Sequence, residues 1–494
     1  MFSSSLDLSI IGNSAISALI DQSGQIVWCC FPRFDGDPIF CSLVDDSESS
    51  PTGHYSIELL NCVNFQQKYK KNTAIVSTIL TDKNGGSIEI SDFIPRFKQY
   101  GRIFRPMTIV RIVKRLNGSP RICIKLRPKT GYGAYLPQTT IGSNHIRFFM
   151  KDLNLRLTTD APISFIEKEI PFVLENTVTL LFGPDEPLEE NVTKTGRDFY
   201  EHTSQYWFDW SRSLSIPFEW QDPVIRAAIT LQLSSFEDSG AIIAAHTTSI
   251  PEAQGSKRNW DYRFCWLRDS FFVVQALNSL GATHTMENYL CFINNIVAGG
   301  FQDHIQPVFG ISMERTLTEI EIPSLSGYQK MGPVRAGNSA YQQIQNDGYG
   351  SLIMACAQMF FDERLAKPGG KTLFKQLEIF GEKAATLWDK PDAGIWELRT
   401  RSEVHTFSSL MCWVACDRLQ KISRQMQYPN RETYWLKKSE KIKNGIITNA
   451  WNKNLNSFCD TFGGTGADAC LLLMADLGFL SPKDPKFLGT LNYI

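Results

Sequence analysis

The hydrophobic period of the chain changes near residue 194, and this change restricts the folds open to it. Before it, apolar and polar residues alternate, which is the pattern of half-buried antiparallel strands. Lys83-Asn84-Gly85 separates two such runs as a hairpin turn. The predicted strands cover residues 73–82, 86–96, 107–118, 121–128 and 145–160. We therefore expect an antiparallel β-sandwich over residues 1–193.

Beyond that point the apolar spacing becomes helical. The segment 195–214 has aromatic residues near helical spacing and predicts a linking helix within 194–217. Asp222-Pro223 supplies an N-cap and an N1 proline for the next helix. Further predicted helices cover 269–281, 285–298, 339–361, 371–388, 405–424, 430–453 and 466–478, with no strands between them. The expected fold is α+β multidomain, with a helical barrel over 218–494 whose loops build a site at one end.

Charge and targeting features exclude several functional classes. Fifty Lys and Arg stand against 51 Asp and Glu, so there is no electrostatic reason to expect nucleic acid or an anionic membrane as partner. The N-terminus lacks the basic and apolar regions of a secretory signal, and no apolar run reaches membrane-spanning length. The 12 Cys suit a reducing compartment, and we expect a cytoplasmic protein.

The other role considered for the cysteines, besides that of reduced thiols, is the binding of a metal ion. Cys412 and Cys416 are four residues apart on a predicted helix, with His405 upstream. No CxxC pair and no close pair of histidines accompanies them, so we expect no metal.

The densest chemical segment is RNWDYRFCWLRDS, residues 258–270. It holds three Arg, two Asp, two Trp and a Tyr directly before an apolar helix. Charges among aromatic residues are costly to bury unless they are paired or hydrogen-bonded. One interpretation is a pocket for a polyhydroxylated ligand. The other is a buried Arg–Asp network that braces the helix, with Asp269 near its positive N-terminus.

Two further segments contain candidate site residues. In PDAGIWELR, 391–399, apolar neighbours can raise the pKa of Glu397 as a general acid requires, whereas Arg399 would lower it. Taken alone, Glu397 also fits a surface loop. The segment 333–350 contains Gln345, Asn346 and Asp347 together with Arg335 and Asn338; by itself it also fits a helix with amide caps.

These segments together resemble the signature blocks of glycoside hydrolase family 15, the glucoamylases and related trehalases. The block 258–270 is similar to the family's long first block, and GIWELR followed by HTFSSLMCWVACDR (405–418) resembles the next pair in order and spacing. GPVRAGNSAYQQIQND resembles the intervening block, and residues 11–40 resemble the β-sandwich domain of bacterial, trehalase-like members. Ser409 departs from the family pattern, which commonly has Lys there.

The resemblance implies a fold, a reaction and a set of site residues. It implies a β-sandwich, a linking helix and an (α/α)6 barrel that hydrolyses terminal α-glucosyl bonds with inversion, without metal or organic cofactor. Glu397, directly after Trp396, takes the general-acid position. The implied substrate-binding residues are Trp266, Arg268, Asp269, Trp396, Gln345, Asn346 and Asp347.

An inverting mechanism also requires a general base, about 6.5 to 9.5 Å from the acid. In the family this Glu lies well beyond the general-acid block, and the final segment KFLGTLNYI resembles a stretch that precedes it. The predicted helices also fall short of six pairs. We therefore expect an incomplete barrel that lacks its last helices and its base. Asp269 and Asp347 are assigned to sugar binding rather than to this role.

Three hypotheses follow for function. The first is an exo-acting α-glucosidase of glucoamylase type that acts on α-linked oligosaccharides or polysaccharides. The second is a trehalase, which the N-terminal resemblance favours. The third is a truncated chain that binds α-glucosides without turnover. The expected partner is in each case an α-glucoside, and the oligomeric state stays open.

Overall fold

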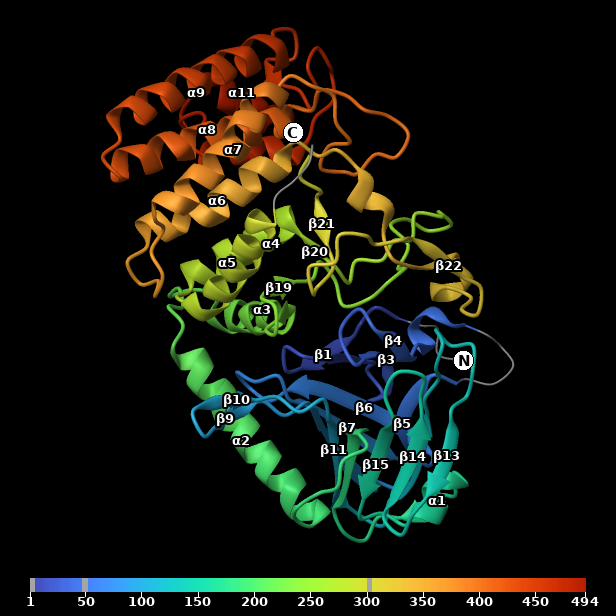
Figure 1. The fold of residues 1–494 in the computed structure, drawn as a ribbon. Coiled ribbons are helices and arrows are strands. Elements are labelled where there is room, and N and C mark those ends of the chain that lie inside the picture. The colour runs from blue at the N-terminus through green and yellow to red at the C-terminus, as the bar shows by residue number, and fades with distance from the viewer. Residues whose placement is uncertain (1–4, 47–51, 300–303) are drawn as a thin grey trace.

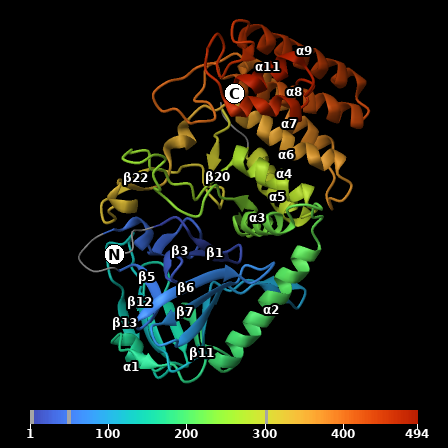
Figure 2. The same cartoon turned by 180° about the vertical axis from the view of Figure 1, so that it is seen from behind.

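The computed structural model describes residues 5–46, 52–299 and 304–494. Strands make up the first part of the chain and helices most of the second, and the long helix α2 (Val192–Arg212) runs along the flank of the strands toward the helices (Figures 1 and 2). The expected order of an antiparallel β part followed by a helical part is therefore confirmed.

Two large antiparallel sheets form the β part. The first has the order β1-β2-β3-β5-β12-β16, with β4 paired to β3, and the second has the order β13-β14-β15-β17-β11-β8-β7-β6. The strands of the first sheet are β1 (Ser9–Gly12), β2 (Ser17–Ile20), β3 (Ile26–Phe31), β4 (Asp37–Phe40), β5 (His54–Leu59), β12 (Arg121–Arg127) and β16 (Phe172–Val173). The strands of the second are β6 (Cys62–Tyr69), β7 (Val76–Asp82), β8 (Ser87–Phe93), β11 (Ile109–Asn117), β13 (Gln138–Ile141), β14 (His145–Phe149), β15 (Leu155–Thr159) and β17 (Val178–Pro184).

Four of the five predicted runs, 73–82, 86–96, 107–118 and 121–128, contain β7, β8, β11 and β12, and the fifth differs. The hairpin β7–β8 pairs in register from Val76↔Asp92 to Thr81↔Ser87, and the buried face of β8 includes Ile88 and Ile90. The run 145–160, predicted as one strand, is instead the hairpin β14–β15. Residues 150–154 turn the chain there, because the Asp and Asn in this stretch favour a turn over a continued strand.

The helical part contains the helices α3 to α11 and short two-stranded pieces between them. Its helices are α3 (Gln221–Leu233), α4 (Leu267–Ser279), α5 (Thr283–Ala298), α6 (Asp347–Phe361), α7 (Lys371–Leu387), α8 (Thr406–Gln425), α9 (Pro429–Ala450), α10 (Leu473–Asp476) and α11 (Pro485–Tyr493). The strand pairs are β18–β19 (235–236 and 241–242), β20–β21 (265–266 and 308–309), β22–β23 (320–322 and 334–336) and β24–β25 (451–452 and 457–458). The expectation of no strands between the helices is thus wrong. Within the described ranges no helix is long and apolar enough to cross a bilayer.

Three predicted helix boundaries also need correction. Helix α3 begins at Gln221, so Asp222 lies in its first turn rather than at its N-cap; Pro223 fits there because a first-turn residue needs no N–H partner. The predicted helix 339–361 is a 3₁₀ turn over Ser339–Gln342, a break, and then α6. The predicted helix 466–478 shortens to a 3₁₀ turn and α10, and Gly478 at positive φ follows it.

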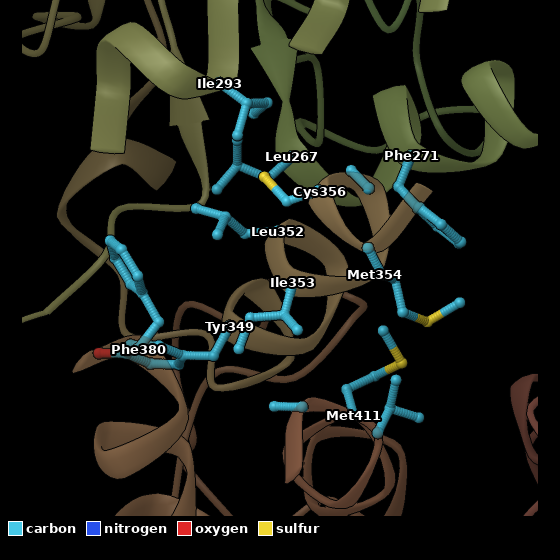
Figure 3. Packing of buried hydrophobic residues seen from close by; sticks show 14 of the residues in the cluster. Leu267, Phe271, Ile293, Tyr349, Leu352, Ile353, Met354, Cys356, Phe380 and Met411 are labelled. Carbon is cyan, nitrogen blue, oxygen red and sulfur yellow. The ribbon is translucent and has the colours of Figure 1, made fainter. Parts of the chain in front are cut away.

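One large apolar core joins helices α4 to α11. Leu267 and Phe271 of α4, Leu352 and Ile353 of α6 and Met411 of α8 lie in it (Figure 3). Helices α6 and α8 approach so closely that a Cβ atom at Gly350 would lie 2.3 Å from the Met411 carbonyl oxygen. This core positions the start of α4 and the start of α6 next to each other.

A fully buried ion pair connects the loop before α4 to the sandwich. Arg263 donates from Nη2 to Asp261 at 2.8 Å, and neither side chain is exposed. Its Nη1 donates to the Gly36 carbonyl at 2.8 Å, and its Nη2 to the Tyr132 hydroxyl at 3.2 Å. The bracing interpretation of the 258–270 block therefore holds for this pair.

Asp261→Asn is predicted to destabilise the protein by about 3 kcal/mol or more, because it leaves the buried guanidinium of Arg263 without a counter-charge. Chemical denaturation followed by circular dichroism measures this loss. The matched control is Asp222→Asn, which breaks the solvent-exposed pair with Lys71 (3.5 Å) and is expected to cost about 1 kcal/mol or less. Equal losses in the two variants would contradict the bracing role.

Candidate active site

A cavity of about 500 Å³ opens where the loop before α4 meets the turn 392–399. Its lining residues are Glu252, Arg258, Trp260, Tyr262, Trp266, Arg268, Asp269, Ile395, Trp396, Glu397 and Arg399. Aromatic faces and paired charges thus share one concave surface, as expected of a ligand site.

The turn that presents Glu397 has an unusual backbone. Glu397 has φ +54°, a left-handed conformation that costs a residue with a side chain roughly 1 to 2 kcal/mol. Gly394 has φ +67°, and a Cβ atom there would lie 2.7 Å from the ring of His405. The Ala393 N–H donates to the Ile344 carbonyl at 3.0 Å, which ties the turn to the segment before α6. Strained residues of this kind concentrate at functional sites.

Three groups converge on one oxygen of the Glu397 carboxyl. Trp266 Nε1 donates to Oε1 at 2.5 Å and Gln345 Nε2 donates to it at 3.2 Å, while Arg268 Nη2 lies 3.6 Å away. Trp266 is fixed by the short strand β20, which pairs with β21 immediately before α4 begins. Among the described residues, Oε2 has no hydrogen-bond partner, and Glu397 lines the cavity.

The environment raises the pKa of Glu397 above its ordinary value. Burial is the main cause; Arg268 and the hydrogen bonds from Gln345 and Trp266 act in the opposite direction, and the charge of Asp269 adds to the rise. A carboxyl that keeps its proton to higher pH is suited to act as a general acid.

Arg268 holds three carboxylates around one guanidinium. Its Nη1 lies 3.3 Å from Asp347 Oδ2, its Nε lies 3.7 Å from Asp269 Oδ2, and its Nη2 faces Glu397. Asp269 Oδ2 and Asp347 Oδ1 are buried without a hydrogen-bond donor. Such atoms ordinarily find a partner, and sugar hydroxyls are suitable donors.

The predicted site residues divide into three groups by position. Glu397, Trp266, Arg268, Asp269 and Trp396 line the cavity. Gln345 and Asp347 are buried behind it and bond to Arg268.

Asn346 faces away from these groups. Its backbone N–H donates to Asp392 Oδ2 at 2.8 Å, and its side-chain amide reaches the Leu387 and Lys390 carbonyls at 3.4 Å. These contacts join the start of α6 to the turn that carries Glu397. Asp392, which the sequence did not single out, therefore positions two of the blocks, and burial raises its pKa to about 6.

Two further side chains make contacts that the sequence did not predict. Arg399, expected to lower the pKa of Glu397, instead bonds Glu319 at 2.7 Å and stacks on Trp260 at 3.6 Å. Trp396 is 61% exposed at the rim, and its Nε1 donates to Asp468.

The cysteines considered for a metal lie in the core. Cys412 is buried on α8 with its Sγ near the Asn346 carbonyl, and burial raises its thiol pKa well above the ordinary value. A protonated thiol is a poor metal ligand. No group of three or more His, Cys, Asp or Glu in the described part of the chain is arranged to hold a metal ion.

Comparisons with protein families cover both parts of the chain. Residues 221–494 match the sequence model described as "Glycosyl hydrolases family 15". Residues 5–162 match the one described as "Trehalase-like, N-terminal".

Several curated relatives match along almost the whole chain. The "Trehalase" of Thermoplasma volcanium is 29% identical over 98% of this chain and 77% of its own length. "Trehalase 1" of Sulfolobus acidocaldarius is 30% identical over 99% of this chain and 81% of its own. The "Trehalase" of Mycobacterium tuberculosis is 26% identical over 98% of this chain and 74% of its own length.

A solved structure of similar fold is a bacterial glucoamylase complexed with acarbose. It superposes with a TM-score of 0.67 over 100% of this chain and 78% of the other, at 12% sequence identity. At that identity the likeness concerns the fold.

Glu397→Gln is predicted to raise the melting temperature at neutral pH. Because the folded protein holds the Glu397 proton more tightly than the unfolded chain, the wild type loses stability as pH rises from the ordinary pKa of a glutamic acid to the raised one. Thermal melts between about pH 4 and pH 8 should show the difference vanish at the acidic end.

Glu319→Gln is the matched control with the opposite sign. Burial raises the pKa of Glu319, but hydrogen bonds from Arg399 and the Ser339 N–H, with the nearby Arg charges, lower it overall. This variant should melt below the wild type at neutral pH. A Glu397→Gln protein that also melts lower would contradict the raised pKa of Glu397.

Proposed function

The chain belongs to glycosyl hydrolases family 15, and we propose that its substrate is α,α-trehalose, which it hydrolyses to two molecules of glucose. The observation that carries the proposal is the placement of Glu397, whose carboxyl has a raised pKa and faces a cavity built by Arg268, Asp269 and Trp266. The sequence alone favoured a glucoamylase type. The relatives called trehalase, which match almost the whole chain, support the alternative better.

The proposed first event is proton transfer to the glycosidic oxygen. Protonated Glu397 donates from its carboxyl as the C–O bond to the leaving glucose breaks, and Trp266 Nε1 and Gln345 Nε2 hold the carboxyl in place and stabilise the anion that forms. Arg268 and the carboxylate oxygens of Asp269 and Asp347 that have no donor bond the hydroxyls of the other glucose, whose anomeric carbon is attacked.

Water completes the reaction from the opposite face. It attacks the anomeric carbon, loses a proton to a carboxylate base, and inverts the configuration, so one product is β-glucose and the other α-glucose. We assign Asp269 and Asp347 to the sugar hydroxyls, because both already lie against Arg268. Turnover by the 494-residue chain therefore also tests whether it supplies its own base; a chain that binds trehalose without turnover is the remaining hypothesis.

The proposal includes the architecture that supports the site. We assign residues 1–193 to the sandwich domain, 194–217 to the linker and 218–494 to the catalytic domain, whose helices belong to the (α/α)6 type. The proton donor and the sugar-binding residues named above all lie in this last domain, and the reaction as proposed needs no metal or organic cofactor.

Glucose release from trehalose and from maltotriose, assayed separately, tests this function. We expect release from trehalose, with little from maltotriose, and a loss of about 100-fold or more in kcat for Glu397→Gln, because a general acid contributes on that scale. Product anomers read early by polarimetry or NMR should include β-glucose.

The matched control is Glu321→Gln, a similar substitution at an exposed carboxylate that pairs with Arg335. It should keep normal turnover. Release from maltotriose alone would favour the glucoamylase type, and a Glu397→Gln protein with normal turnover would contradict the role of this acid.

A further inference from the structure

The active-site cavity has two chemically different ends. The inner end is Arg268 with Asp269, and the buried Asp347 lies behind Arg268. The outer end contains an ion pair, Glu252 with Arg258, which we call the outer pair. The reaction proposed above uses only the inner end.

A continuous wall leads from Glu397 to the outer pair. The rings of Trp266 and Tyr262 lie 5.5 Å apart, and Trp266 bonds Glu397. The Tyr262 hydroxyl donates to Glu252 Oε1 at 3.1 Å, and Arg258 Nε donates to Glu252 Oε2 at 2.5 Å. The outer pair is therefore one tyrosine away from the tryptophan that holds the acid.

Exposure separates the acid and its cation from the outer pair. The side chains of Arg268 and Glu397 are 12% and 18% exposed, whereas those of Arg258 and Glu252 are 47% and 32% exposed. Asp269, beside Arg268, is 43% exposed, so solvent also reaches this end of the cavity. The outer pair thus lies nearer to solvent than the acid does.

Arg258 has unused hydrogen-bonding capacity. Its backbone N–H donates to Ser256 and its Nε to Glu252, and the part of the chain that the structure describes offers no acceptor to Nη1 or Nη2. Arg263, in the same sequence block, bonds protein groups from Nε, Nη1 and Nη2 alike. The two terminal nitrogens of Arg258 are therefore available to a ligand in the cavity.

We propose that the outer pair binds the leaving glucose of the substrate and so selects for a second sugar unit. This inference rests on the proposed function. A general acid protonates the oxygen between the two sugars, so one sugar lies on each side of Glu397. The inner end binds the glucose whose anomeric carbon is attacked by water, and the outer end contacts the leaving glucose. The free nitrogens of Arg258 donate to neighbouring ring hydroxyls, while Glu252 accepts from one of them.

A comparison of two substrates tests this assignment. Trehalose has a leaving glucose; α-glucosyl fluoride has the same cleaved glucose but releases fluoride instead. We expect Glu252→Gln and Arg258→Lys to lower kcat/KM for trehalose by about 10-fold or more, since lost hydrogen bonds to charged groups have that scale. The effect on α-glucosyl fluoride should be several times smaller.

The matched control is Glu190→Gln, which breaks the similarly exposed pair with Lys194 on α2, away from the cavity. It should behave as the wild type on both substrates. If the outer pair only braces its loop, the two variants will lose activity on both substrates in the same proportion, and that result would overturn the inference.

Binding provides a readout that needs no turnover. Calorimetry with trehalose and with 1-deoxynojirimycin, which mimics a single glucose, should show the outer-pair variants weakened about 10-fold toward trehalose and little changed toward the inhibitor. Equal weakening toward both would overturn the assignment. A wild type that binds and cleaves α-glucosyl fluoride and maltose but not trehalose would instead contradict the proposed substrate. In that case the role of the outer pair is decided by comparing the variants' loss in kcat/KM for maltose with their loss for α-glucosyl fluoride.

Discussion

The arrangement of the site depends on the Arg268 guanidinium and the three carboxylates around it. Asp269 follows it on α4, Asp347 begins α6, and Glu397 comes from a turn 129 residues further along the chain than Arg268. Three like charges in a partly buried space are unfavourable unless a cation is shared among them or one of them takes a proton. Arg268 pairs with all three, and the pKa of Glu397 is raised, chiefly by burial and to a smaller extent by the charge of Asp269. The chemistry of the acid is thus a consequence of how the network is assembled.

The scaffold holds that network through contacts of two kinds. The apolar core between α4, α6 and α8 sets the distance between Arg268 and Asp347, and Gly350 permits the close approach. The Arg263–Asp261 pair fixes the loop before α4 against the sandwich, so the β part takes part in positioning the site. One 13-residue block therefore contains both a structural brace and one wall of the cavity, and the two interpretations of it apply to different residues.

Much of this organisation was predictable from local sequence. Alternation identified the β7–β8 hairpin and aromatic spacing identified α2. The resemblance to the family's motif blocks, rather than local pattern, placed Glu397, Trp266 and Arg268 at one cavity. The break between Gln342 and Asp347 was not predictable from local sequence, because Asp392 bonds the Asn346 backbone there from a distant turn. Glu252 lay in a segment without recognisable periodicity, and only its contacts with Arg258 and Tyr262 gave it a place in the cavity wall.

The sequence by itself determined the order of the two parts of the chain, the types of most elements and the identity of the motif blocks, because these follow from periodicity and from residue types close together in the chain. The tertiary structure alone decided which cation faces Glu397. Arg399 is two residues away in sequence yet bonds Glu319, while Arg268 reaches the carboxyl from another helix. Burial, and hence the pKa of an acid, depends on groups brought together by packing across the fold, and that information is absent from the neighbouring residues.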